Sequence, residues 1–284
     1  MSVLITATEL AAALDAPKPP VVLDVRWRLT VAGGAQYDGH ADYLAGHIPG
    51  AVFVDLETEL AGHGPATEGR HPLPSPVALQ HAARRWGIDD DSAVVVYDGE
   101  GNLAAARAWW LLRWAGLADV RILDGALPAW VAEDRPLATG EVSPTAGSVT
   151  VRPGGVPTIE ADQAGAWATG TGVLIDARAP ERYRGEIEPI DPKAGHIPGA
   201  VNAPTGGNLD DEGRFRSAAE LRARFQALGI TAQIPVAAYC GSGVTAAHEI
   251  AALAIAGFDA ALYPGSWSQW SNTDRPIATG PSAG

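Results

Sequence analysis

The sequence predicts an α/β protein made of two tandem domains, each a mostly parallel β-sheet with helices on both faces. Three observations support this fold class. Sequence blocks recur in the same order in the two halves of the chain. Short apolar segments alternate with glycine-rich loops and helical segments. Finally, 46% of the 284 residues are hydrophobic and 19% are charged, which is typical of globular domains large enough to bury their own cores.

The two halves of the chain share four sequence blocks. AGHIPGAV at 45–52 recurs without change at 194–201, and DRPLATG at 134–140 recurs at 274–280 with one Leu-to-Ile exchange. Between these anchors, VVVYDGEG at 94–101 aligns with VAAYCGSG at 236–243, and ahead of them VLDVR at 22–26 aligns with LIDAR at 174–178. Ordered matches of this kind identify an internal duplication.

The first copy is predicted to span residues 1–140 and the second residues 158–284. Residues 141–157 are rich in Gly, Pro, Ser and Thr, which is typical of a linker. The weak alternation of apolar residues at 147–152 indicates a short strand within it.

Strand, loop and helix follow one another within each copy. Short apolar runs predict buried parallel strands at 20–25, 94–97 and 120–123, and at 173–177, 235–239 and 260–263. Helical segments at 103–114 and 245–255 each follow a glycine-rich loop. Ligands of such sheets bind beyond the carboxyl ends of the strands, and Cys240 stands at one of these ends.

Composition narrows the range of functions. A net charge of -13 disfavours binding to nucleic acid or anionic membranes. A single cysteine excludes an internal disulfide and a multi-thiolate metal site, and the histidines lack metal-ligand spacing, so we expect no metal and no bound cofactor. Without a membrane-spanning apolar stretch or a secretory signal in residues 1–20, we expect a cytoplasmic protein.

Cys240 is the candidate nucleophile. A thiol attacks as the thiolate, and a free cysteine has a pKa of about 8.5. In Cys-Gly-Ser-Gly-Val-Thr at 240–245, the two glycines let backbone N–H groups turn inward, and a helix beginning near Val244 adds its positive end. A lone cysteine is otherwise a small buried apolar residue, but the position of Cys240 before a Gly-x-Gly loop favours the reactive thiolate.

Two other chemistries fit this loop poorly. Cysteine phosphatases carry an arginine at the sixth position after the cysteine to clamp the phosphate, and that position is Ala246 here. The glycines at 241 and 243 are not followed by the third glycine or the lysine of nucleotide-binding loops.

These motifs resemble the rhodanese superfamily, and specifically its tandem-domain sulfurtransferases, over nearly the whole chain. The resemblance rests on the two HIPGA blocks, the loop at 240–245 and Gly-Ser-Trp-Ser-Gln-Trp at 265–270. It implies a silent first copy and an active second copy, in agreement with Asp98 at the position equivalent to Cys240. Asp98 cannot attack sulfur, and we expect it to be a solvated or capping carboxylate.

The resemblance also implies a ping-pong mechanism. Cys240 takes sulfur from a donor as a persulfide, and cyanide, a small thiol or a reduced protein thiol then removes it. Thiosulfate enzymes of the family resemble Cys-Arg-Lys-Gly-Val-Thr in this loop, whereas mercaptopyruvate enzymes resemble Cys-Gly-Ser-Gly-Val-Thr. Because the present loop offers the Ser242 hydroxyl and no charge, we expect 3-mercaptopyruvate, whose leaving enolate needs a proton relay.

Further site residues follow from the same resemblance. Two arginines before the second HIPGA block bind the donor carboxylate in the mercaptopyruvate subfamily. Arg184 matches the first, Ile190 stands where the second is expected, and Arg182 is either a substitute or a surface charge. Glu57 matches an acidic relay residue, and His71 resembles a residue of the inter-domain cleft or is a structural loop histidine.

The remaining loop residues are expected to line the donor site, namely Gly241, Gly243, Val244 and Thr245, the last also capping the helix. His47 and His196 occur in both copies, so we expect them to be structural.

Two alternative functions stay open. A thiosulfate:cyanide sulfurtransferase is favoured if Arg182 and Arg184 together offset the uncharged loop. A persulfide relay or redox-sensing partner protein would use the same Cys240 without appreciable turnover.

Overall fold

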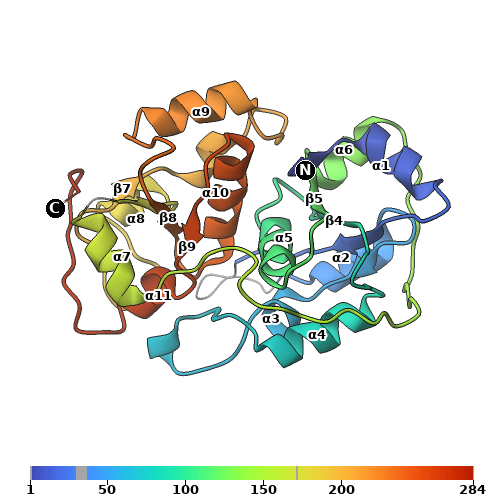
Figure 1. Ribbon diagram of the computed structural model, residues 1–284, viewed down its shortest axis with the longest axis horizontal. Coiled ribbons are helices and arrows are strands. Elements are labelled where there is room, and N and C mark those ends of the chain that lie inside the picture. The colour runs from blue at the N-terminus through green and yellow to red at the C-terminus, as the bar shows by residue number, and fades with distance from the viewer. Residues whose placement is uncertain (1, 30–36, 171, 284) are drawn as a thin grey trace.

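The computed structural model describes residues 2–29, 37–170 and 172–283, which form two α/β domains lying side by side (Figure 1). Within the described residues, the first domain contains a five-stranded parallel sheet in the order β1 (Leu4–Ile5), β5 (Val120–Leu123), β4 (Val94–Tyr97), β2 (Val21–Asp24) and β3 (Val52–Phe53). The central strands β2 and β4 are short Val-rich runs, buried on both faces as parallel strands require.

The second domain repeats this sheet. Its strands follow the order β7 (Val201–Asn202), β6 (Val173–Asp176), β8 (Val236–Tyr239) and β9 (Ala261–Leu262), all parallel. The counterpart of β1 is reduced to a single parallel bridge between Thr158 and Leu262. The duplication predicted from the sequence is therefore also present in the strand order.

Helices cover both faces of each sheet. In the first domain they are α1 (Ala7–Leu14), α2 (Gly39–Ala45), α3 (Leu56–Glu59), η1 (Ala66–Glu68), α4 (Pro76–Arg85), α5 (Ala105–Trp114) and α6 (Ala126–Ala132). In the second they are α7 (Ala161–Ala168), α8 (Pro180–Tyr183), η2 (Thr205–Asn208), α9 (Ala218–Gln226), α10 (Val244–Ile255) and α11 (Ser266–Trp270). Local signals agree with these bounds: for example, Ser217 and Glu220 form a reciprocal capping box at the start of α9.

The sheets separate three clusters of buried side chains. Because side chains alternate along a strand, Val95 and Tyr97 pack on one face of the first sheet with α1, whereas Val94 and Val96 pack on the other with α5. The inner faces of the two domains belong to one continuous cluster. Helices α5 and α10 face each other across the domain boundary and join this cluster (Figure 1).

The linker does not contain the short strand predicted at 147–152. These residues form no strand because their N–H groups bond to the ends of first-domain elements. Gly147 donates to the Arg84 carbonyl at 2.8 Å and Arg152 to the Ala115 carbonyl at 2.8 Å. A Cβ atom on Gly147 would lie 2.1 Å from the Ile88 carbonyl oxygen, so only glycine permits this approach. The predicted domain boundaries at 140 and 158 stay a prediction.

The HIPGA histidines have the structural role expected of them. His47 and His196 are fully buried, and the backbone of each exchanges hydrogen bonds with the second repeated block, at Ala138 and Ala278. Each imidazole also stacks on a tyrosine of its own domain, with ring centroids 4.2 Å and 3.8 Å apart. None of the described helices is long and apolar enough to cross a bilayer.

Candidate active site

Cys240 lies directly after β8, at the carboxyl end of the second sheet, where the sequence predicted it. The residue is 1% exposed, and its sulfur accepts a hydrogen bond from the Gly243 N–H at 3.2 Å. Gly243 adopts a left-handed conformation (φ +82°) and a Cβ there would lie 2.5 Å from the Pro264 carbonyl oxygen, so the turn requires glycine. Helix α10 begins at Val244, so its positive end points towards the sulfur.

In the first domain, the loop equivalent to the cysteine loop is filled by the side chain of Asp98. Asp98 is 4% exposed and accepts hydrogen bonds from four backbone N–H groups, those of Glu100, Asn102, Ala104 and Ala105. Burial nevertheless raises the pKa of the Asp98 carboxyl to about 7. Asp98 is therefore a capping carboxylate that occupies the anion-binding loop, which explains why this copy has no free site there.

Ser242 belongs to a chain of three side chains that crosses the domain boundary. Its Oγ lies 2.7 Å from Nδ1 of His71, and Nε2 of His71 lies 3.1 Å from Glu57. A carboxylate can only accept, so in the neutral imidazole Nε2 carries the proton and Nδ1 accepts from Ser242. The hydrogen bond from His71 lowers the pKa of Glu57. Trp27 holds the carboxylate from its other side, with Nε1 donating at 2.6 Å.

The two arginines near the second HIPGA block lie in different places. Arg182 is largely buried, lines the central cavity and is held by Glu188, which its Nη2 meets at 2.6 Å. Arg184 does not line the cavity; it is partly exposed and pairs with Glu186 at 2.7 Å. The structure therefore does not bring Arg184 to the site as expected, because the two side chains leave opposite sides of the short helix α8.

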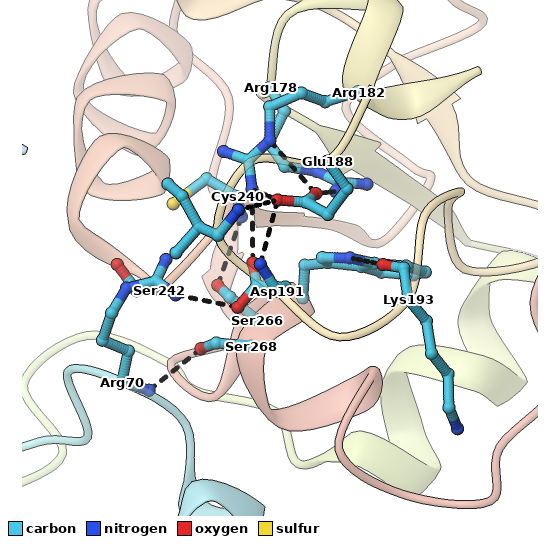
Figure 2. A network of polar contacts seen from close by, with 12 residues as sticks. Arg70, Arg178, Arg182, Glu188, Asp191, Lys193, Cys240, Ser242, Ser266 and Ser268 are labelled. Atoms are coloured by element: carbon cyan, nitrogen blue, oxygen red, sulfur yellow. Dashed lines mark hydrogen bonds and ion pairs between the residues drawn. The ribbon is translucent and has the colours of Figure 1, made fainter. Parts of the chain in front are cut away.

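Arg70 was not predicted from the sequence. Its Nη1 donates to Asp191 at 2.8 Å, and its backbone N–H donates to Ser268 Oγ at 3.0 Å in α11 (Figure 2). Its position directly before His71, which was predicted to face the cleft, was the only sequence signal.

Arg107 was also missed. It is fully buried on α5, and its guanidinium donates to the carbonyls of Leu60, His71, Pro72 and Gly243. Burial lowers its pKa to about 10, and the charge of the Cys240 sulfur acts in the opposite direction. Its position as a charged residue in the otherwise largely apolar segment 104–114 was the sequence feature that could have indicated its role.

Arg70, Arg182 and the cysteine loop border one cavity of about 790 Å³ between the domains. The predicted site residues Glu57, His71 and Gly243 do not line it. Gly241, Ser242, Val244 and Thr245 form its floor, with Cys240 immediately beneath. The side chain of Thr245 lines the cavity but does not cap α10, whose N-cap is Gly243 without a side-chain bond. Trp27 and the silent loop at 98–101 form the opposite wall.

Within the part of the chain that is described, no cluster of His, Cys, Asp or Glu could hold a metal ion.

The sequence matches the Rhodanese-like domain over residues 6–133 and again over residues 160–273. The chain belongs to the rhodanese family. The two matches coincide with the two sheets, so the molecule is a tandem rhodanese with one cysteine-bearing loop.

Relatives of similar length place this tandem rhodanese among the sulfurtransferases. A Mycobacterium tuberculosis protein provisionally named thiosulfate sulfurtransferase SseB is 52% identical, over 98% of this chain and 97% of its own. A Pseudomonas aeruginosa protein named as a probable 3-mercaptopyruvate sulfurtransferase is 46% identical, over 98% of both chains. The crystal structure of the 3-mercaptopyruvate sulfurtransferase SseA from Escherichia coli matches with a TM-score of 0.80 and 34% identity, over 94% of this chain and 99% of that one. The protein is accordingly an enzyme of the sulfurtransferase class.

Proposed function

We propose that this sulfurtransferase takes sulfur from 3-mercaptopyruvate and passes it to a thiol or to cyanide through a persulfide on Cys240. The observation that carries the proposal is the chain from Ser242 through His71 to Glu57, beside a cysteine loop without charged side chains. A proton relay of this kind serves a donor whose leaving group is a carbon base. Thiosulfate, which leaves as sulfite, has no such requirement.

The first half-reaction forms a sulfur–sulfur bond. The Cys240 thiolate attacks the donor sulfur, the C3–S bond breaks, and its electron pair stays on C3 as the enolate of pyruvate. Ser242, whose hydroxyl is oriented by its hydrogen bond to His71, donates a proton to C3 and recovers the proton of the donor thiol, so that pyruvate leaves and Cys240 carries the persulfide anion. Because Cys240 is 1% exposed, its side chain or the loop above it moves to meet the donor.

Two arginines have separate roles in this step. Arg107 is a buried cation that forms no ion pair with a carboxylate among the described residues, and it stabilises the Cys240 thiolate. Arg182 lies in the cavity beside Gly241 and binds the carboxylate of the donor.

The second half-reaction restores the enzyme. Cyanide or a thiolate attacks the outer sulfur of the persulfide, the sulfur–sulfur bond breaks, and the Cys240 thiolate is regenerated together with thiocyanate or a new persulfide. The cavity volume of about 790 Å³ exceeds that of a three-carbon donor several-fold, which leaves room for a small thiol acceptor.

A second donor is favoured by one observation. Arg70 and Arg182 both approach the cysteine loop and supply the two cations that the loop itself lacks, and such a pair fits the dianion thiosulfate. The M. tuberculosis relative carries a thiosulfate sulfurtransferase name.

Mass spectrometry of the protein after incubation with each donor tests the proposal. We expect a gain of one sulfur from 3-mercaptopyruvate on the wild type and none on Cys240→Ala. No gain from either donor would refute sulfur transfer through Cys240, and a higher kcat/KM with thiosulfate would refute the donor assignment. A persulfide that forms without turnover would instead indicate a relay or sensing protein.

A further inference from the structure

The backbone of Cys240 is held by the first turn of α11. Its N–H donates to the Ser266 hydroxyl at 3.2 Å (Figure 2), and its carbonyl accepts from the Trp267 N–H at 3.0 Å. The next carbonyl of the loop, that of Gly241, accepts from the Ser268 N–H at 2.8 Å. Because the planar peptide groups on both sides of the Cys240 Cα are bonded to α11, this turn sets the direction in which the Cys240 side chain leaves the backbone.

Ser266 adopts an uncommon backbone conformation at this contact. Its φ is +53°, in the left-handed region that residues other than glycine seldom adopt. The side chain is fully buried, and its hydroxyl donates to the Tyr263 carbonyl at 3.0 Å. Since a hydroxyl has a single hydrogen, its oxygen can only accept from the Cys240 N–H. One bond of the hydroxyl therefore orients the serine, and the other holds the cysteine.

The first domain contains the same turn at the start of α6. The two DRP blocks align Ala126 with Ser266. Ala126 is also fully buried and has a φ of +55°. The Leu127 N–H after it donates to the Asp98 carbonyl at 3.1 Å, as the residue after Ser266 donates to Cys240. The left-handed turn is thus common to both copies and does not by itself serve catalysis.

Two of the three contacts belong to the active copy alone. Ala126 has no hydroxyl to accept a backbone N–H. Pro128, which aligns with Ser268, has no N–H to donate to the loop. The additional contacts accompany the cysteine, and of the side chains in this turn the Ser266 hydroxyl is the one that bonds to the Cys240 backbone.

We propose that Ser266 is a positioning residue for Cys240, whose sulfur it aims at the incoming donor by fixing the Cys240 N–H. Without the hydroxyl this buried N–H loses its acceptor, and the peptide group turns towards another one and displaces the sulfur from the Gly243 N–H. The inference rests on the proposed function, because it takes Cys240 as the nucleophile. It applies to either donor, since attack by the same sulfur begins the transfer from 3-mercaptopyruvate and from thiosulfate.

Ser266→Ala tests this role, and Ala126 shows that alanine fits the turn. Rapid-quench mass spectrometry would follow persulfide formation at several concentrations of each donor. We expect the rate constant at saturating donor to fall about 10-fold with both donors, as for the loss of one buried hydrogen bond. The donor concentration that gives half of the maximal rate should not change, because the groups that bind the donor are retained.

Ser266→Gly separates the hydroxyl from the backbone conformation. Glycine adopts a positive φ without strain, so this variant should have a higher Tm than Ser266→Ala. We nevertheless expect both variants to form the persulfide at the same reduced rate. Ser271→Ala is the matched control, since Ser271 directly follows α11, is fully buried, and its hydroxyl has no hydrogen-bond partner among the described residues. It should react as the wild type.

Each outcome supports or overturns the inference. A wild-type rate in Ser266→Ala would show that the hydroxyl does not position the sulfur. Rates that follow Tm across the two variants, or a raised half-saturating concentration with both donors, would show that Ser266 only maintains the loop. These results overturn the inference while the proposed function stands. Persulfide formation that persists in Cys240→Ala would overturn both.

Discussion

Ser242 and His71 come from different domains, yet their side chains approach within 2.7 Å. The cysteine loop and the segment before α4 thus share one hydrogen-bonded chain that ends at Glu57, whose side chain is half exposed. Proton transfer to a carbon base along this chain depends on the serine hydroxyl, whereas nucleophilic attack depends on Cys240.

Replacement of Ser242 by alanine should therefore affect the two donors unequally. We expect kcat with 3-mercaptopyruvate to fall by about 100-fold or more, the usual contribution of general acid catalysis, while turnover of thiosulfate falls much less. Steady-state kinetics with cyanide as acceptor would measure both. Equal losses would contradict the relay.

Glu249 on α10 is a buried acid outside this chain. It is fully buried, and one of its oxygens accepts from Asn208 at 2.6 Å. Burial raises the pKa of its carboxyl from 4.5 to about 7. Between these two values the folded protein holds a proton that the unfolded chain has released. The free energy of unfolding therefore decreases as the pH rises through this range and changes no further above it.

Glu249→Gln should remove this dependence. We expect the variant to resemble the wild type at pH 5 and to exceed its stability at pH 8 by up to about 3 kcal/mol, at about 1.4 kcal/mol for each unit of pKa shift. Urea unfolding at several pH values measures the difference. The exposed Glu212→Gln is the control and should follow the wild type, and parallel curves for Glu249→Gln would disprove the assignment.

Prediction from the sequence succeeded at single residues and failed where two segments distant in sequence meet. Cys240, Ser242 and Glu57 were each predicted from residues close to them in sequence; in the structure Ser242 lines the cavity and is joined to Glu57 through His71, and Cys240 lies in the same loop as Ser242. Arg182 and Arg184 are only two positions apart, so the sequence could not determine which of them faces the cavity before the bounds of α8 were known. Arg70 approaches Gly241 across 171 positions of the chain, with no periodicity or spacing to indicate the contact.

At the scale of elements, α5 and α10 are the two copies of one helix. When Asp98 is aligned with Cys240, Arg107 occupies the position of Glu249, and both are fully buried. The two charges do not pair. Arg107 donates to the Gly243 carbonyl in the catalytic loop, whereas Glu249 bonds to Asn208 within its own domain. The silent helix thus keeps a charge that serves the active site of the other copy.

Arg107→Gln should make Cys240 less reactive. Without the buried cation we expect the rate of its alkylation by iodoacetamide at pH 7 to fall about 10-fold or more, because the sulfur loses its neighbouring positive charge. Arg107→Lys keeps the charge and should recover part of the rate. An unchanged rate in a folded Arg107→Gln would show that Arg107 only ties the carbonyls of the two domains together.

At the scale of the molecule, the site is assembled from both domains. Glu57, His71 and Arg107 come from the first, and Cys240 and Ser242 from the second. The buried apolar cluster between α5 and α10 contains residues of both sheets, among them Val96 and Ala238. A cluster shared in this way couples the stabilities of the domains.

We therefore expect the full chain to unfold in a single transition. Urea curves from far-UV circular dichroism and from tryptophan fluorescence should coincide, and the amides of β4 and β8 should exchange with deuterium at the same free energy of opening. Two separate transitions, or much weaker protection of one sheet, would show that the domains unfold independently.

The position of Cys240 beneath its loop has a consequence for the chemical lifetime of the protein. At 1% exposure the thiol is out of reach of the thiol of a second molecule in this conformation, and among the 284 residues there is no other cysteine. A disulfide between two copies therefore requires the same movement of Cys240 or its loop that donor binding requires. Oxidative cross-linking of the enzyme should accordingly be slow compared with that of a protein whose thiol is exposed.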